Sequence, residues 1–368
     1  QETLIKDLNM NAPSIPQGFS LFHEDLEQIL ELAKHDLLAL QGCNILLTGC
    51  TAFFGKWLIE SLLWADLELK LRLKLTVLTR SSKHFLEAMP HFLTRKNLHL
   101  VQGDILSLSK VDIPDFDFAV HGVNLPNDLS LSWPARHMYT AVLGTENIMT
   151  IAAQKGCRNL LLLSSGAVYG IQARQATIPF TENSLPVDMR EPAIYGNTKR
   201  FLEFYAQAKG EELGISVSVA RCFAFIGAYM PLNEQNAMSS FLLHALQRRP
   251  ITINGDGTPL RSFLSGRDLS IWLLAALIRG NGRIYNIGST QTYSLHEWAK
   301  KVLFCAELPE NFLTVKGQAL RGNAPNAYQP DTSAIRQDLN LTETASPEKN
   351  IETTLKWFLA HQHLIPLS

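Results

Sequence analysis

The sequence predicts an α/β protein, in which a doubly wound parallel sheet is followed by a smaller C-terminal α/β lobe. Short runs of apolar residues alternate with segments of helical spacing, which is typical of parallel strands buried under helices on both faces. Beyond about residue 225 these runs shorten and the loops lengthen, and residues 254–257 (NGDG) have the composition of a hairpin turn. We therefore expect an N-terminal arm and helix over 1–40, the sheet domain over 41–225 and mainly the smaller lobe over 226–368, with some of its segments returning to the sheet domain.

The individual elements follow in order along the chain. Apolar residues at helical spacing predict a helix over 24–40, packed outside the main sheet. Continuous apolar runs predict the strands, and amphipathic segments between them predict the helices. The expected strands are 44–48, 75–79, 98–101, 116–120 and 159–163, and the expected helices are 53–67 and 134–154. Ligands of such sheets bind at the carboxyl ends of the strands, and the smaller lobe should close over that edge.

Composition disfavours several classes of partner. The 368 residues are 46% apolar and 18% charged, with a formal net charge of −1. This balance provides a large core but no cationic excess for nucleic acid or anionic membranes. No apolar run approaches the roughly 18 residues that a membrane-spanning helix needs. No signal peptide is visible, although a chain that begins with Gln rather than Met leaves a processed N-terminus open.

Cysteine and histidine usage favours a reducing compartment without a metal site. The five cysteines form no CxxC pair, which disfavours a disulfide framework or a zinc ribbon, so we expect a cytoplasmic protein. His361 and His363 have no third ligand, and we expect them at the surface. Cys50 is either a small filler, which we favour, or a thiol activated by a helix N-terminus.

The stretch LTGCTAFFG (residues 47–55) follows the first expected strand and opens a helix. This is the context of the dinucleotide-binding turn of Rossmann domains: the first glycine allows the tight turn, and the last lets the helix approach the strand. The N–H groups and partial positive charge of the helix N-terminus then hold the pyrophosphate, and an ordinary glycine-containing turn is the alternative. The cofactor-contacting residues expected here are Gly49, Thr51, Ala52, Phe53, Phe54 and Gly55.

Two later positions bear on the adenosine half of the cofactor. Arg80 stands after the second strand, where an acidic residue would bind the ribose hydroxyls of NAD, and an arginine suits the 2′-phosphate of NADP. We therefore expect NAD(P), with NADP favoured over NAD; stacking of Arg80 on the adenine, or a solvent-facing Arg80, is the alternative. Asp104, next to Ile105, either accepts a hydrogen bond from the adenine amino group or only ends a strand.

Tyr195 and Lys199 carry the predicted chemistry. At a spacing of i, i+4 on a helix, both side chains project from one face, roughly 5–6 Å apart. A phenol with a pKa of about 10 needs about 4 kcal/mol to become a base near pH 7. One cation about 4 Å away supplies about that much at an effective dielectric of about 20. Lys199 should therefore be able to activate Tyr195 unaided, and an oxidised nicotinamide would add to the effect.

Tyr195 would then exchange a proton with a substrate hydroxyl or carbonyl while the nicotinamide exchanges a hydride. Ser165, just past the fifth strand, would hydrogen-bond the same oxygen.

Taken in order, the motifs of the chain resemble those of an extended short-chain dehydrogenase/reductase of the nucleotide-sugar epimerase/dehydratase family. The resemblance runs from about residue 43 to 358. Its motifs are TGCTAFFG, GDI, AVHGVN, VLGT, SSGAVYG, YGNTK, ARCFAFIG, INGDGTPLRSFL, YNIGS and DTSAIRQDL.

The resemblance implies roles for individual residues. Ser165, Tyr195 and Lys199 correspond to the catalytic triad of the family. Arg261 matches an arginine that holds the diphosphate of a nucleotide-diphospho-sugar substrate, where a bidentate guanidinium suits phosphate oxygens, and Arg321 resembles a second. The cofactor-lining positions of the family include Gly49, Ala52, Gly55 and Asp104.

The resemblance also implies a homodimer with a four-helix interface. Helix 134–154 and the helix that carries Tyr195 would form it. Phe201, Phe204 and Tyr205 lie on the face of that helix away from catalysis, where we expect core or dimer packing.

The first departure from the family pattern concerns the reaction. Dehydratases of the family carry an Asp–Glu pair straight after the catalytic hydroxyl residue, and decarboxylases usually keep a Glu in the second place; here these positions are Gly166 and Ala167. This argues against 4,6-dehydration by the usual route. We favour a sugar epimerase that works through a 4-keto intermediate. The alternatives are an NADPH-dependent 4-ketoreductase, a dehydratase with displaced acid–base residues and a non-catalytic cofactor-sensing protein, which the retained Tyr–Lys pair disfavours.

Two further departures concern binding. Ala224 stands where many relatives have an Asn on the diphosphate side of the substrate, so we expect the nucleotide to be gripped through Arg221, Asn233 or Asn236. Asn124 stands where relatives have small apolar residues, and we expect it to hydrogen-bond beside the cofactor.

Overall fold

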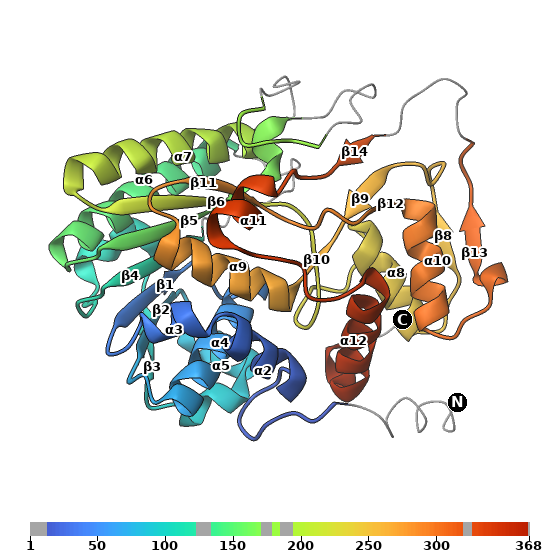
Figure 1. The fold of residues 1–368 in the computed structure, drawn as a ribbon, viewed down its shortest axis with the longest axis horizontal. Coiled ribbons are helices and arrows are strands. Elements are labelled where there is room, and N and C mark those ends of the chain that lie inside the picture. The colour runs from blue at the N-terminus through green and yellow to red at the C-terminus, as the bar shows by residue number, and fades with distance from the viewer. Residues whose placement is uncertain (1–12, 123–133, 171–178, 185–193, 319–325, 367–368) are drawn as a thin grey trace.

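The computed structural model describes residues 13–122, 134–170, 179–184, 194–318 and 326–366. At its centre lies a seven-stranded sheet of order β11-β6-β5-β4-β1-β2-β3, in which every pairing is parallel (Figure 1). The strands are β1 (Asn44–Thr48), β2 (Lys74–Thr79), β3 (Leu98–Gln102), β4 (Phe118–Gly122), β5 (Asn159–Ser165), β6 (Ser216–Cys222) and β11 (Ile284–Ile287). The predicted doubly wound fold is confirmed, and β11 from the C-terminal third forms one edge of the sheet.

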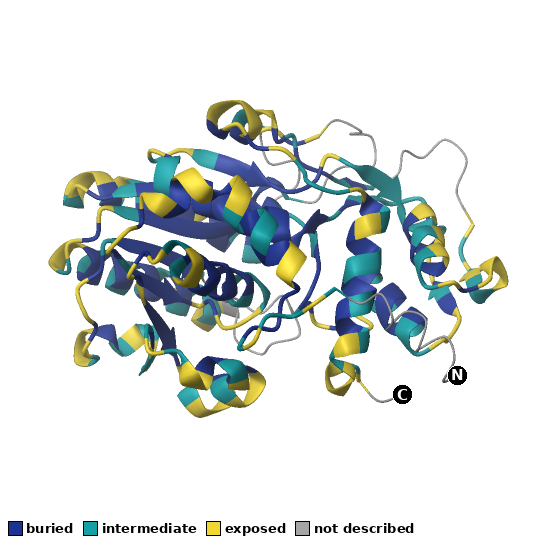
Figure 2. Cartoon of the chain, turned by 60° about the horizontal axis from the view of Figure 1, so that its bottom comes forward, coloured by how far each residue is buried: buried dark blue, intermediate teal, exposed yellow. Residues whose placement is uncertain are grey.

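Helices cover both faces of this sheet. α6 (Pro134–Gln154) and α7 (Ile194–Leu213) lie together on one face, and α4 (Phe53–Leu69) and α9 (Gly266–Arg279) lie on the other (Figure 1). Because successive strand residues point to opposite faces, Leu47 packs into the core under α4 and α9, whereas Leu46 packs into the core under α6 and α7. Figure 2 shows the strands buried and the outer faces of the helices exposed.

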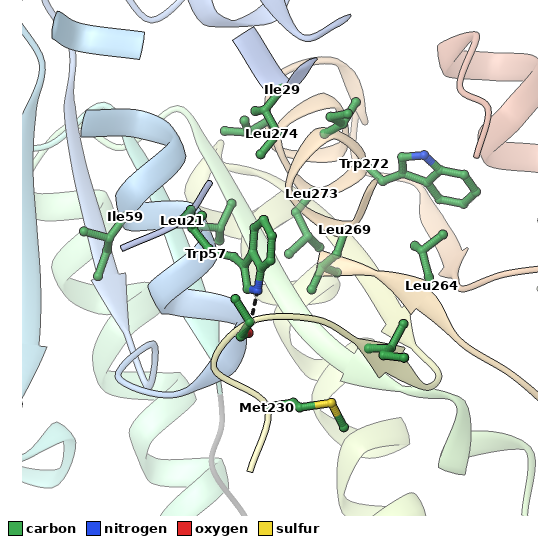
Figure 3. Close-up of a cluster of buried hydrophobic side chains, with 14 of the residues drawn as sticks. Leu21, Ile29, Trp57, Ile59, Met230, Leu264, Leu269, Trp272, Leu273 and Leu274 are labelled. Atoms are coloured by element: carbon green, nitrogen blue, oxygen red, sulfur yellow. Dashed lines mark hydrogen bonds between the residues drawn. The ribbon is translucent and has the colours of Figure 1, made fainter. Parts of the chain in front are cut away.

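The core under α4 and α9 is continuous with the segment that precedes the sheet. Figure 3 shows Leu21 and Ile29 from this segment beside Trp57 of α4 and Leu273 of α9. The indole Nε1 of Trp57 donates a hydrogen bond of 2.9 Å to the carbonyl oxygen of Ala228. Burying an indole is favourable when its N–H finds such a partner.

The predicted N-terminal helix is wrong as a single element, because it divides at Ala33 into α2 (His23–Leu32) and α3 (Lys34–Leu38). Both pack outside the sheet against α9, as expected. Asp25 of α2 forms a buried ion pair with Arg267 at 3.0 Å, and burial raises the pKa of Asp25 to about 6. Asp36 of α3 accepts two hydrogen bonds from Arg279, at 2.6 and 2.9 Å. Each of the two short helices therefore contributes one carboxylate that pairs with an arginine of α9.

Glu60, on α4, joins distant segments of the chain. One of its carboxylate oxygens accepts hydrogen bonds from the backbone N–H groups of Ser20 and Leu21, each at 3.0 Å. The other contacts the His91 ring at 3.0 Å and the hydroxyl of Tyr229, which follows β7 (Phe225–Ile226). This carboxylate is fully buried, and its four partners satisfy the hydrogen-bonding need that burial creates.

The C-terminal residues build small sheets beside the main one. β9 (Leu260–Ser262) lies between β12 (Thr292–Ser294) and β14 (Ala327–Tyr328), while β8 (Ile251–Ile253) pairs with β13 (Leu313–Val315). The hairpin expected at 254–257 is therefore wrong, because β8 and β9 pair with other strands and not with each other. In the described parts of the chain, the remaining elements are α5 (Ser82–Ala88), α8 (Ala237–Leu246), β10 (Leu264–Ser265), α10 (Leu295–Cys305), α11 (Ser333–Leu339), α12 (Pro347–Ala360) and five short 3₁₀ helices.

Within the described ranges, no helix combines the length and the apolar character that crossing a membrane requires.

Candidate active site at the carboxyl edge of the sheet

A cavity of about 700 Å³ opens at the carboxyl ends of β1, β2, β4 and β5. The first turns of α4 and α7, the middle of α6, and α5 complete its walls. The expected site residues that line it are Gly49, Thr51, Ala52, Phe53, Phe54, Gly55, Arg80, Asp104, Ile105, Tyr195 and Lys199. Ser165, Arg261 and Asn236 lie outside its lining, and Asn124 and Arg321 lie outside the described residues.

The glycine turn at the mouth of the cavity has no room for side chains. Gly49 has φ +65°, and a Cβ atom there would lie 1.5 Å from the carbonyl oxygen of Gly122 on β4. A Cβ atom at Gly55 would lie 1.7 Å from the carbonyl oxygen of Cys50. Ala52 precedes the first helical residue of α4, and no side chain caps this helix. Its first N–H groups therefore remain available to an anion in the cavity.

Arg80 and Asp104 stand at the far end of the same cavity. Arg80 is exposed and has no hydrogen bond or ion pair with another described residue. Asp104 begins a 3₁₀ helix (Ile105–Lys110) and accepts a hydrogen bond of 2.8 Å from the N–H of Leu106 through Oδ1. Asp104 thus follows the end of β3 and also lines the cavity, and its hydrogen bond with the adenine amino group stays a prediction.

Tyr195 and Lys199 lie one turn apart on α7 and both face the cavity. The Lys199 ammonium nitrogen lies 5.8 Å from the centroid of the Tyr195 ring and donates a hydrogen bond of 2.8 Å to the carbonyl oxygen of Leu163. Burial lowers the pKa of Lys199 to about 8, although the negative charge of Glu203 opposes the shift. The lysine is therefore held in place and still carries its charge at neutral pH.

The expectation that Lys199 activates Tyr195 unaided is wrong for the protein alone. Burial raises the pKa of Tyr195 above its ordinary value, and the largest opposing contribution is a hydrogen bond with Ser165. Spacing along the helix predicted that the two side chains would be neighbours, but it contained no information on how deeply the phenol is buried. Further stabilisation of the phenolate must come from what binds in the cavity.

Ser165 ends β5 and precedes a 3₁₀ helix (Gly166–Tyr169), whose Ala167 N–H donates to its Oγ at 3.2 Å. Its hydroxyl also lies within interaction range of the hydroxyls of Tyr195 and Tyr328, and this interaction opposes the rise of both phenol pKa values. The three hydroxyl groups therefore meet beyond the cofactor-sized cavity, on the side of the smaller lobe. Tyr328 is a member of this centre that sequence reasoning missed, because no motif singled it out.

Arg261 reaches the same region from β9. It is half-buried, lies opposite Tyr328 in the register of β9 and β14, and donates to the Leu260 carbonyl oxygen at 2.7 Å. Asn236 begins α8 as an exposed residue, and no hydrogen bond within the described ranges joins it to Ser165 or Tyr195. Asn233 accepts a hydrogen bond from the N–H of Gln235.

The expectation that Arg221 grips the nucleotide is wrong. Its guanidinium is buried and donates to both carboxylate oxygens of Glu203, at 2.8 to 3.1 Å, and to the hydroxyl of Tyr169 at 2.8 Å. Glu203 also accepts from the hydroxyl of Ser164, the neighbour of Ser165. This ion pair lies one helical turn beyond Lys199 and ties α7 to β5 and β6, so Arg221 is occupied within the protein.

His121 lines the cavity, and the sequence reasoning gave it no role. It lies at the end of β4, with Nδ1 2.6 Å from the Thr48 hydroxyl and Nε2 3.2 Å from the Thr145 hydroxyl. Burial lowers its pKa to about 3, and the nearby Lys199 charge adds to this shift. The imidazole is therefore neutral at physiological pH and acts as a hydrogen-bonded wall of the cavity.

The structure also places Cys50 and the two histidines near the C-terminus, His361 and His363. Burial raises the pKa of Cys50 to about 12, and its thiol donates to the Thr48 carbonyl oxygen at 3.3 Å, so this residue is a filler and not an activated thiol. His363 is exposed, but His361 is half-buried. The His361 ring stacks on Trp357 and contacts the Ser20 hydroxyl, so its expected surface position is wrong.

Fold and site together define an extended short-chain dehydrogenase/reductase: a doubly wound parallel sheet, a glycine turn opening on a cavity, and a Tyr–Lys pair facing it. More particularly, the chain belongs to the NAD dependent epimerase/dehydratase family, whose family model matches residues 45–288.

Individual relatives agree with this assignment. The chain is 25% identical over 323 residues to UDP-glucuronic acid decarboxylase 1 of Xenopus tropicalis, across 87% of this chain and 73% of that one. Its fold is similar to that of epimerase Mth375 of Methanothermobacter thermautotrophicus, with a TM-score of 0.74 at 22% identity over 91% of this chain and 98% of the other. It is also similar to UDP-glucose 4-epimerase of Thermotoga maritima, solved with UDP-glucose, with a TM-score of 0.70 at 19% identity over 87% and 99%.

The residues present fit the dinucleotide that the family name implies. Gly49 and Gly55 permit the close backbone contacts of the turn, and the uncapped N-terminus of α4 lines the cavity, where a pyrophosphate would be stabilised by N–H groups and by the helix dipole. Arg80 and Asp104 stand at one end of the cavity, and Tyr195 with Lys199 at the other. The cavity can therefore take an elongated ligand with its anionic centre at the glycine turn.

Proposed function

We propose that the protein is an NAD(P)-dependent epimerase of nucleotide-diphospho-sugars that works through a 4-keto sugar. One observation carries the proposal: the Ser165 hydroxyl lies next to the phenol of Tyr195 at the edge of the cavity, while positions 166 and 167 offer no carboxyl group. Phenol and serine hydroxyls suffice to move the proton of a carbinol. As the sequence resemblance implies, dehydratases of the family carry acidic side chains at both positions, and decarboxylases usually carry a Glu at the second.

The residues of the site have distinct tasks in this reaction. Tyr195 Oη takes the proton of the sugar hydroxyl and later returns it, and Ser165 Oγ hydrogen-bonds the same sugar oxygen. Lys199, fixed on the Leu163 carbonyl oxygen, keeps a positive charge beside the phenol. Arg261 would bind the diphosphate of the substrate, with Arg321 and Asn236 as further candidates. When bound, NAD(P) would supply the reversible hydride acceptor for the carbinol carbon and a positive charge near Tyr195.

An NADPH-dependent 4-ketoreductase is the second candidate, and Arg80 favours it. The arginine has no protein partner among the described residues and faces the adenosine end of the cavity, where a 2′-phosphate would pair with it. A dehydratase with displaced acid–base residues ranks third.

The freshly purified protein separates these candidates. An epimerase should release tightly bound NAD(P) on denaturation, identified by mass spectrometry, and should convert a sugar nucleotide without added cofactor. A reductase should consume one NADPH for each keto sugar reduced. Formation of a 4-keto-6-deoxy sugar from a 6-hydroxy substrate would contradict both and favour the dehydratase.

Replacing Arg80 by Ala tests the cofactor preference. Loss of a charge-assisted contact with a 2′-phosphate should weaken NADP(H) binding by about 10- to 100-fold while NAD changes by less than about twofold, as measured by calorimetric titration. Lys83→Ala is the control, because this side chain is 87% exposed and lies outside the cavity lining. Equal weakening of both cofactors would instead place Arg80 on the adenine, which they share.

The pKa of about 8 for Lys199 predicts an alkaline limit to turnover. The ammonium form is present below about pH 8 and lost above it, so kcat should fall about tenfold for each pH unit well above this value. Arginine stays charged throughout this range. In Lys199→Arg, activity should therefore be lower but free of this alkaline fall. If Lys199→Arg showed the same alkaline fall in kcat, the fall would belong to an ionisable group other than Lys199.

We further propose a homodimer that buries the outer faces of α6 and α7. These helices pack side by side, and Tyr139, Phe201 and Phe204 on them are 64%, 49% and 76% exposed (Figure 1). Aromatic side chains gathered on one exposed face are typical of a protein–protein contact. The molecular mass in solution tests this.

A further inference from the structure

We propose that Tyr328 is a positioning residue of the catalytic centre, which fixes the Ser165 hydroxyl as a hydrogen-bond donor, toward Tyr195 in the protein alone and toward the substrate oxygen once a substrate is bound. The inference rests on the proposed function, because it assigns a role within the same reaction. It adds to the triad a residue from the smaller lobe that lies far from the triad in the sequence.

The pairing of two short strands brings Tyr328 to this position. β14 runs parallel to β9, and Tyr328 lies opposite Arg261 in their register. The Tyr328 ring packs against Phe223, with 4.8 Å between the ring centroids. Tyr328 thus has a defined orientation and shares its sheet with the arginine expected to hold the substrate's diphosphate.

The missing side chain at position 166 makes room for the Tyr328 hydroxyl. A Cβ atom at Gly166 would lie 2.6 Å from the Tyr328 oxygen and 2.8 Å from Cε1 of Phe223. Even an alanine would therefore have to displace the phenol. The position that carries an acid in dehydratases of this family is here covered by a neutral hydroxyl from another strand.

Counting donors and acceptors gives the direction of the hydrogen bonds. A serine hydroxyl has one proton to donate and two acceptor lone pairs. Ser165 Oγ accepts one bond from the Ala167 N–H at 3.2 Å. Burial raises the pKa of Tyr328 well above its usual value, so this phenol keeps its proton and can donate the second bond. Both lone pairs are then used, and the Ser165 proton is directed to the Tyr195 oxygen, where it lowers the pKa of that phenol.

Other titratable groups face this cluster from three elements. They are Lys199 from α7, Cys222 from β6 and Arg261 from β9. Burial raises the pKa of Cys222 to about 12, so the thiol stays neutral in the working range. The charges that remain, on Lys199 and Arg261, are not altered by removing the Tyr328 hydroxyl.

Tyr328→Phe tests the proposal, because it deletes the hydroxyl and keeps the ring. We expect kcat to fall about tenfold, as for the loss of one hydrogen bond in the transition state, with KM within about twofold. The acid limb of the pH profile should shift to higher pH. Tyr293→Phe is the matched control, because Tyr293 lies opposite Arg261 on the other side of β9 and packs against Trp298.

A second readout does not depend on turnover. In protein labelled with [¹³Cζ]tyrosine, the Tyr195 resonance is assigned by its absence in Tyr195→Phe, and its pKa is then measured in each variant. The proposal requires a higher Tyr195 pKa in Tyr328→Phe and an unchanged one in Tyr293→Phe. If this shift occurs in a protein that epimerises no sugar nucleotide, the positioning role stands and the proposed reaction fails.

Gly166→Ala provides an independent check. It should lower kcat in the wild-type background and lower it less in Tyr328→Phe. The added methyl group would meet Phe223 in both backgrounds, but it would meet a hydroxyl at position 328 only in the wild-type background. A raised KM with an unchanged kcat and an unmoved Tyr195 pKa in Tyr328→Phe would overturn the proposal and make Tyr328 a simple substrate contact.

Discussion

Tyr195→Phe should reduce the conversion of sugar nucleotides by about 10²- to 10⁴-fold, the range expected when a general acid–base group is removed. The phenylalanine ring keeps its place beside Lys199, but it has no oxygen to exchange a proton with the substrate. Cofactor binding should change little, because the glycine turn is untouched. Turnover and the amount of bound dinucleotide are to be measured on the same preparation.

Tyr139→Phe is a suitable control for this substitution. Tyr139 is 64% exposed on α6 and lies outside the cavity lining, so activity should be unchanged. Full activity of Tyr195→Phe with every sugar nucleotide tested would remove the catalytic assignment.

Gly49→Ala should abolish dinucleotide binding and destabilise the fold. A left-handed backbone costs a non-glycine residue about 1–2 kcal/mol. Here the added Cβ would also lie 1.5 Å from the carbonyl oxygen of Gly122, so β1 and β4 would have to separate at the mouth of the cavity. We expect a lower Tm and a loss of cofactor affinity of more than about 100-fold, measured by thermal unfolding and by titration.

Gly42→Ala separates the cost of the left-handed backbone from the cost of the steric clash. Gly42 has φ +73°, and a Cβ atom there would meet nothing within 4 Å. The free energy of unfolding of this variant should fall only by the cost of the left-handed backbone, about 1–2 kcal/mol. The variant should bind the cofactor normally. Normal binding by Gly49→Ala would show that the turn does not hold the dinucleotide.

Local patterns were sufficient to predict most strands of the main sheet, but β6 and β11 are not among the expected strands. Five strands were visible as apolar runs, and β1 with the glycine turn and α4 was predicted almost to the residue. The N-terminal helix and the hairpin at 254–257 were wrong for a different reason. Their outcome depends on partners, such as Arg279 for Asp36 and β13 for β8, that lie far away in the sequence.

The site shows the same limit. Tyr195 and Lys199 share one helix, so their spacing predicted their proximity. The sequence around Arg221 contains no sign of an ion-pair partner, but the fold pairs Arg221 with Glu203 of α7. Tyr328 belongs to a strand of only two residues, which has no periodicity to detect. The depth of burial, which sets the pKa of Tyr195, is likewise a property of the assembled molecule.

The carboxylate of Glu60 bears on how this protein could be divided. Its partners come from the segment before the sheet, from the region after β2 and from the stretch that leads into the smaller lobe. Trp357 of α12 adds a contact to Ser20 beside it. A fragment cut near residue 225 would keep the buried Glu60 side chain without its partner Tyr229. The complementary fragment would carry Tyr229 and Trp357 without their hydrogen-bond acceptors. Although the substrate and the dinucleotide are expected on different lobes, the two lobes should therefore be inherited, exchanged and engineered as one piece.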